Sequence, residues 1–185
     1  PRSPQVDVWA RARGGAIASL VVDYRDYDTR LAAYAVIVEQ RQGREHVLLA
    51  LWNEGEVPMW TMPGGGVELD ESVEQAAVRE VLEETAFAVE LTGLLGVDSF
   101  VLPAGVRVNT SDRPLKSVRV VFSARIVGGE LTHEQDGTTD EARWIPVEEV
   151  ADLVRVSLVD AALSMDRGSR GTAEAATALV GRPGR

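Results

Sequence analysis

The sequence predicts an α/β fold built on a mixed β-sheet, and three observations support that prediction. Short apolar runs that suit buried strands alternate with segments of helical periodicity. Hydrophobic side chains make up 45% of the 185 residues and charged ones 26%, which is typical of a chain with a buried core. The length favours one domain, and the sequence shows no internal repeat or linker. Helices layered on one mixed sheet are therefore expected.

The first half of the chain contains two predicted strands and the clearest predicted helix. Residues 31–39 and 46–52 are short apolar runs, and the polar stretch between them suits a hairpin. Residues 53–66, with two prolines and three consecutive glycines, are predicted as turns. A helix is predicted over 72–85, because Ser72 and Gln75 match a capping box. Its core-facing stripe is expected to be Val73, Ala77, Val78, Val81 and Leu82.

The second half of the chain predicts further strands and helices. An apolar segment covers residues 87–102, and apolar and polar residues alternate over 117–127, as in a strand. A short strand is predicted at 142–145. Pro146 suits the start of a helix over 147–154, and a last helix is predicted over 158–165. We therefore expect a domain over residues 31–165. Residues 1–30 are predicted to be an N-terminal extension packed on that domain. Residues 166–185, rich in Gly, Arg and Ala, are predicted to form a flexible tail.

Charge and composition exclude several functional classes. The net charge of −10 opposes binding to a polyanion, so no stable nucleic-acid partner is expected. The absence of cysteine excludes a disulfide scaffold, a cysteine nucleophile and a thiolate zinc site. The single lysine, Lys116, follows no glycine-rich loop, which argues against a P-loop. No run approaches the ~18 apolar residues of a membrane span, and the start is polar, so a cytoplasmic protein without a membrane partner is expected.

Three acids on the predicted 72–85 helix suggest a metal site. At about 100° per residue, Glu80, Glu83 and Glu84 share an arc of roughly 100°. Their mutual repulsion costs a few tenths of a kcal/mol per pair, and a divalent cation among them would remove that cost. Ligands that are all oxygen select a hard ion, Mg²⁺ or Mn²⁺. The alternative reading of these acids alone is an ordinary acidic helix face.

A motif around this helix identifies a family. Residues 65–87 read GGVELDESVEQAAVREVLEETAF, which resembles the Nudix box, G-x5-E-x7-R-E-U-x-E-E-x-G-U with U a bulky aliphatic residue. Phe87 fills the last apolar slot, and Ala86 replaces the final glycine, which would suit a helix C-cap with positive φ. We expect that replacement to reduce stability and to leave the chemistry intact. The matching positions are Gly65, Glu71, Arg79, Glu80, Val81, Glu83 and Glu84.

The resemblance implies an α/β/α sandwich and a reaction. Nudix proteins typically use Mg²⁺ or Mn²⁺ to hydrolyse a nucleoside diphosphate linked to another group. By resemblance the metal ligands would be Glu80, Glu83, Glu84 and the carbonyl of Gly64, and Glu71 and Arg79 would orient the loop and helix. The general base is left open between Glu80, Glu83 and a later acid, which would be Glu134, Asp136, Asp140 or Glu141.

The substrate is expected to be ADP-ribose-like or a nucleoside triphosphate, including oxidised forms. Residues 101–127 hold five basic side chains against one acid, and we expect Arg119 and Arg107 to bind a substrate phosphate there. Because family members are often dimers, a homodimer is also expected by resemblance. The alternative function is a Nudix-fold module that senses a nucleotide without cleaving it.

Overall fold

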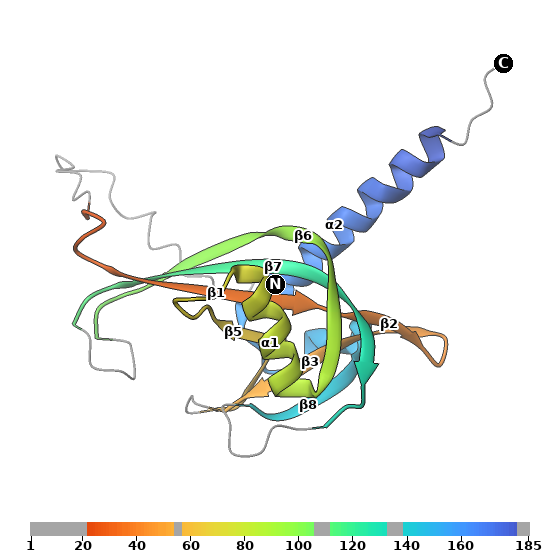
Figure 1. Cartoon of the computed structure of the whole chain (residues 1–185), viewed down its shortest axis with the longest axis horizontal. Helices are drawn as coiled ribbons and strands as arrows, with labels where there is room; N and C mark the ends of the chain where they lie inside the picture. Colours follow the sequence, from red (N-terminus) through yellow and green to blue (C-terminus); the bar gives the residue numbers. More distant parts are fainter. Residues whose placement is uncertain (1–21, 54–56, 106–111, 133–138, 181–185) are drawn as a thin grey trace.

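The structure, a computed structural model, describes residues 22–53, 57–105, 112–132 and 139–180 (Figure 1). Strand β1 (Asp28–Val36) lies between β5 (Gly64–Gly66) and β7 (Leu115–Gly129), with β6 (Phe87–Leu102) at the edge beyond β7. Strand β1 runs parallel to β7, and the other pairings are antiparallel. The predicted mixed sheet is therefore confirmed.

A second sheet is centred on β3 (Arg44–Trp52). Strands β2 (Val38–Arg41) and β4 (Met59–Thr61) pair with one edge of β3, and β8 (Thr139–Pro146) pairs with the other. The turn between β2 and β3 consists of Gln42 and Gly43, with φ of 52° and 79°. Positive φ at both positions matches the twist of a two-residue hairpin, so the predicted hairpin is confirmed. Its first strand is β2 alone, because the predicted strand 31–39 is divided between β1 and β2 in different sheets.

Helices cover both faces of the sheet that contains β1. Helix α1 (Val73–Thr85) packs on one face and α2 (Ser157–Val180) on the other, with a short 3₁₀ helix, η1 (Val147–Asp152), before α2 (Figure 1). This is the α/β/α sandwich that the motif implies. None of the helices in the described part of the chain is long and apolar enough to cross a membrane.

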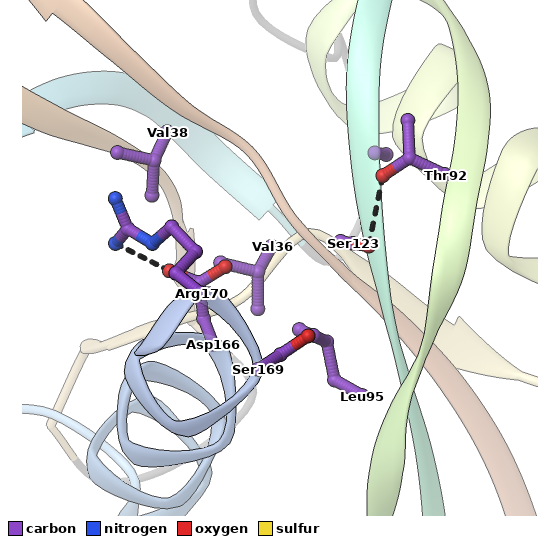
Figure 2. Close-up of a pocket in the computed structure, with 9 residues that line it drawn as sticks. Val36, Val38, Thr92, Leu95, Ser123, Asp166, Ser169 and Arg170 are labelled. Atoms are coloured by element: carbon purple, nitrogen blue, oxygen red, sulfur yellow. Dashed lines mark hydrogen bonds and ion pairs between the residues drawn. The ribbon is translucent and has the colours of Figure 1, made fainter. Parts of the chain in front are cut away.

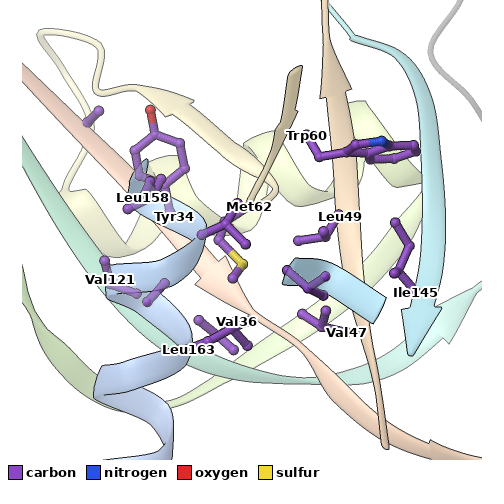
Figure 3. Close-up of a cluster of buried hydrophobic side chains, with 14 residues drawn as sticks. Tyr34, Val36, Val47, Leu49, Trp60, Met62, Val121, Ile145, Leu158 and Leu163 are labelled. Atoms are coloured by element: carbon purple, nitrogen blue, oxygen red, sulfur yellow. The ribbon is translucent and has the colours of Figure 1, made fainter. Parts of the chain in front are cut away.

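From Ala32 to Val36, strand β1 is buried on both faces, which explains the continuous apolar sequence of that part. On one face Ala33 packs against Ala76 and Ala77 of α1. On the opposite face Tyr34 and Val36 belong to the largest core cluster, which joins α2 to both sheets (Figure 3). In that cluster the side chains of α2 are Leu158, Val159, Ala162 and Leu163.

Local sequence signals fix both ends of α1. The Ser72 hydroxyl accepts from the Gln75 backbone N–H at 3.2 Å, and the Gln75 side chain accepts from the Ser72 N–H at 2.8 Å. The predicted capping box is therefore confirmed. The helix ends at Ala86, which has the left-handed φ of 58°. That conformation costs an L-residue about 1–2 kcal/mol, and glycine adopts it freely.

We expect Ala86→Gly to raise the free energy of unfolding by about 0.5–1 kcal/mol, because glycine removes the left-handed strain but adds chain entropy to the unfolded state. Denaturant unfolding of both proteins measures the change. The control is Ala88→Gly on exposed β6, where the same substitution should lower stability by roughly 0.5–1 kcal/mol. A loss of stability in Ala86→Gly would show that the left-handed cap carries no strain.

The structure corrects four sequence predictions. Part of the predicted turn region forms strands β4 and β5, because glycines allow the backbone of β5 to lie close to β1. Leu82, predicted to face the core, is 51% exposed. Residues 147–152 form a 3₁₀ rather than an α-helix. Helix α2 runs to Val180, so residues 166–180 are helical where a flexible tail was predicted.

Ion pairs explain why α2 continues past the predicted end. Arg170 contacts Glu45 on β3 and Asp166 one turn earlier on the helix, both at 2.5 Å. These contacts hold α2 against the second sheet as far as Arg170. Most of the predicted N-terminal extension, residues 1–21, lies outside the described residues, and β1 begins at Asp28, three residues earlier than predicted.

Candidate active site

The glycine run and the loop after it bring the box residues together. In β5, residues 64–66 pair antiparallel with residues 32–34 of β1. The chain then turns into α1, whose first turn lies beside the loop that carries Glu71. The Glu71 carboxylate also accepts from the Glu68 backbone N–H at 2.9 Å, which fixes the loop. Residues far apart in the helix and loop therefore face one another across Arg79.

Arg79 is the centre of the site. Its Nε and Nη2 donate to the two oxygens of Glu71 at 3.1 and 2.7 Å. Its Nη1 donates to Glu80 Oε1 at 3.0 Å and to Glu83 Oε2 at 2.9 Å, and Nη2 also reaches the Gly66 carbonyl at 3.1 Å. One guanidinium thus holds three carboxylates and the glycine strand. The predicted orienting pair, Glu71 and Arg79, is present with bidentate geometry.

Two further contacts fix the acids against the glycines. Glu84 is 6% exposed, and its Oε2 accepts from the Gly64 N–H at 2.9 Å. The Glu80 carboxylate lies against Gly65, because a Cβ at Gly65 would fall 2.6 Å from the Glu80 Cδ. Glycine at position 65 therefore leaves the space in which the Glu80 carboxylate sits.

The electrostatics of the site follow from this packing. The Arg79 hydrogen bonds, helped by the Glu68 N–H, hold the pKa of Glu71 below its usual value. Burial raises the pKa of Glu80 above its usual value, and Arg79 acts against that rise. The pKa of Arg79 is itself raised, chiefly by Glu71. Glu71 and Arg79 therefore remain ionised over the physiological range.

The donor set fits a hard divalent cation. Glu80 Oε1 and Glu83 Oε2 lie within 3.0 Å of one cationic nitrogen, Arg79 Nη1, so two carboxylate oxygens already face a common positive charge. Oxygen donors of this kind match Mg²⁺ or Mn²⁺. Within the described residues no three acidic or histidine side chains converge as a ready-made ion site. The four predicted ligands share one corner of the fold, but Glu84 bonds to Gly64, whose backbone contribution here is its N–H.

Arg119 lies in a different setting from the one predicted. It is 7% exposed, its Nε donates to Asp98 Oδ2 at 2.8 Å, and its guanidinium lies 4.5 Å from the centroid of the Phe100 ring. A third contact, 3.3 Å long, joins Nη2 to the Ser157 hydroxyl at the start of α2. Its charge is thus already matched by a carboxylate of the chain, and its role toward substrate stays a prediction. Arg107 lies outside the described residues.

Of the later acids proposed as alternative bases, the structure describes the side chain of Glu141 alone. Glu134 and Asp136 lie outside the described residues, and Asp140 is described only as part of the β8 backbone. Glu141 Oε1 accepts from Arg143 Nε at 2.9 Å on β8. The choice between Glu80, Glu83 and a later acid therefore stays open.

Two cavities lie away from the box. One, of about 250 Å³, is bounded by α2 and strands β1, β2, β6 and β7. Figure 2 shows the Asp166–Arg170 ion pair on one side of it and the Thr92–Ser123 hydrogen bond on the other. The other, of about 480 Å³, lies over β8 and η1 and is lined by Trp60, Arg143 and Leu153 among others. Neither is lined by the box residues, so the geometry around Arg79 defines the candidate site.

Comparison with known proteins places the chain in a family. The NUDIX domain model matches residues 28–163, and the chain belongs to the Nudix family. It is 40% identical over 115 residues to the "Putative 8-oxo-dGTP diphosphatase" of Bacillus subtilis, covering 61% of this chain and 64% of that protein. It is 36% identical over 84 residues to the ADP-ribose pyrophosphatase of Methanocaldococcus jannaschii, covering 44% of each. The chain thus spans less than two thirds of either relative.

A solved structure supports the fold. The NUDIX hydrolase from Nitrosomonas europaea superposes with a TM-score of 0.62 at 23% identity, covering 77% of this chain and 90% of that one. The order of strands and the two covering helices described above are therefore those of a Nudix fold.

One basic residue beside the box, Arg30 on β1, was not among the predicted site residues, because its place depends on pairing between strands distant in sequence.

Proposed function

We propose that this chain is a metal-dependent pyrophosphohydrolase that cleaves a diphosphate linkage in a nucleoside diphosphate bonded to another group. The observation that carries this proposal is that one nitrogen of Arg79, Nη1, holds a carboxylate oxygen of Glu80 and one of Glu83 close together. Such a cluster of acids is costly unless cations balance it, and a diphosphate substrate brings further negative charge that needs the same balance.

The residues divide the work by position. Glu80, Glu83 and Glu84 would hold Mg²⁺ or Mn²⁺, which when bound neutralises phosphate oxygens and lowers the pKa of water. Glu71 and Arg79 hold the loop against the helix, so the acids keep their places while substrate enters. A carboxylate of the cluster, Glu80 or Glu83, accepts the proton of the attacking water, with the later acids as the alternative source.

Two substrate classes are proposed, ADP-ribose-like molecules and nucleoside triphosphates including oxidised forms. Relatives carry names of both kinds, as an ADP-ribose pyrophosphatase and an 8-oxo-dGTP diphosphatase. The same chemistry serves both, because each contains a phosphoanhydride next to a nucleoside. The part of the substrate beyond the diphosphate decides between them.

A substrate panel tests the proposal. The protein is incubated with ADP-ribose, 8-oxo-dGTP, dGTP and NADH, and released AMP, nucleoside monophosphate, phosphate or pyrophosphate is measured. We expect turnover of at least one compound with Mg²⁺ or Mn²⁺, loss of turnover in excess EDTA, and recovery when the metal is restored. Shifts in melting temperature on nucleotide addition without any product would instead show a sensing module, and turnover undiminished by EDTA would contradict the metal requirement.

A further inference from the structure

Arg30 lies beside the candidate site, on the strand that pairs with the glycine run. It precedes by two residues Ala32, which pairs with Gly66 of β5. Its Nη2 is 3.7 Å from the point that a Cβ on Gly66 would occupy. The Gly66 carbonyl also accepts from Arg79 Nη2 at 3.1 Å. Two guanidinium groups therefore approach Gly66, one from the sheet and one from the helix.

The backbone at Arg30 is held on both sides. Arg30 pairs with Ser117 of β7, and the carbonyl of the next residue, Leu31, accepts from the Val67 N–H at 3.1 Å. A side chain on such a strand is positioned more accurately than one on a loop. The guanidinium itself is exposed to solvent, at the end of a rigid base.

Arg30 forms no ion pair with another residue that the structure describes. Among the arginines that the structure describes, Arg30 and Arg167 are the two that make no ion pair. Arg167 is exposed on α2 and forms no part of the box. Arg30 thus combines a charge outside any ion pair with a place against Gly66, whose carbonyl also accepts from Arg79.

We propose that Arg30 is a substrate-binding residue whose guanidinium holds the diphosphate of the substrate over Gly66, beside the Arg79 cluster. The inference rests on the proposed function, because it takes the ligand to be a diphosphate. Guanidinium and phosphate form paired, charge-assisted hydrogen bonds. An arginine that makes no ion pair within the protein breaks none when it binds a phosphate. Arg79 is engaged by three carboxylates and Arg119 by Asp98, so Arg30 is better placed than either to take a phosphate.

Binding of a diphosphate without a nucleoside tests this role directly. Methylenediphosphonate cannot be hydrolysed, and its affinity in the presence of Mg²⁺ is measured by titration calorimetry for wild type, Arg30→Ala, Arg30→Lys and Arg167→Ala. Losing a charge-assisted pair should weaken binding about tenfold or more in Arg30→Ala. Lysine should restore part of the affinity, because it keeps the charge without the planar fork. Arg167→Ala removes a comparable exposed charge away from the box and should bind as wild type does.

Kinetics on the substrate found in the panel give a second readout. Arg30→Ala should raise KM about tenfold and leave kcat within about twofold, as expected when a contact is equally strong in the ground and transition states. Since Arg30 is exposed and unpaired, the melting temperature should be that of wild type. Equal methylenediphosphonate affinity in Arg30→Ala and wild type, or an equal loss in Arg167→Ala, overturns the proposal.

The two proposals fail separately. Wild-type turnover with unchanged affinity in Arg30→Ala leaves the hydrolase standing and removes Arg30 from its site. Arg30-dependent binding of methylenediphosphonate without turnover of any panel compound keeps Arg30 as a phosphate-binding residue and rejects hydrolysis. Wild-type protein that does not bind methylenediphosphonate rejects the role of Arg30.

Discussion

Glu83→Gln is expected to lower turnover about 1,000-fold, because a neutral amide withdraws roughly 4 kcal/mol of charge stabilisation from the transition state. Glu83 is the most exposed of the three clustered acids, with half of its side chain accessible, and its carboxylate bonds to Arg79 Nη1 at 2.9 Å. Glutamine has the same shape and can keep one weaker hydrogen bond. Stability should therefore change by no more than about 0.5 kcal/mol.

The measurement is kcat on the substrate found in the panel, with a thermal melt of the same preparation. Glu74→Gln is a matched control, since Glu74 is an exposed acid in the first turn of the same helix. We expect its turnover to match wild type. If Glu83→Gln kept more than a tenth of wild-type activity, Glu83 would hold neither the metal nor the catalytic proton.

Adjacent alanine substitutions in the glycine run should have opposite consequences. A Cβ at Gly64 would lie 2.3 Å from the Ala33 carbonyl oxygen and 2.6 Å from the Tyr34 Cα, and its φ is 140°. Both obstacles are backbone atoms of the buried central strand, so neither can move without breaking the sheet. We expect Gly64→Ala to lose more than about 4 kcal/mol of stability, or to fail to accumulate as soluble protein.

At Gly65 the obstacle is the mobile end of a side chain, the Glu80 carboxylate at 2.6 Å. Gly65→Ala should therefore fold with a loss of about 1 kcal/mol, while the displaced carboxylate lowers kcat about 100-fold. Chemical unfolding and kinetics of the two variants separate the effects. A stable Gly64→Ala, or a fully active Gly65→Ala, would contradict the packing described for β5.

The box residues could be predicted from the sequence because their contacts are local. Ser72, Gln75 and Arg79 act within a helix and the loop before it, so spacing alone places them. The helical projection also grouped Glu84 with Glu80 and Glu83, and in the structure Glu84 is 6% exposed and accepts from the Gly64 N–H. The same projection wrongly placed Leu82 on the core-facing stripe, because a projection does not show where the neighbouring sheet ends.

Other features depend on pairings that no local pattern reveals. Asp98 and Arg119 are paired across β6 and β7, and Asp98 accepts from the guanidinium of Arg119, which the sequence predicted to bind a substrate phosphate. Arg30 is brought close to Gly66 by the pairing of β1 with β5, a glycine strand that the sequence predicted to be a turn.

The parallel pairing of β1 with β7 has a consequence for biosynthesis. Asp28 pairs with Leu115, so the strand bearing Arg30 stays without one neighbour until residues 115–129 have been synthesised. Contacts this distant along the chain slow folding, because a large loop must close before they form. Nascent chains halted before β7 should therefore expose the apolar part of β1 to chaperones.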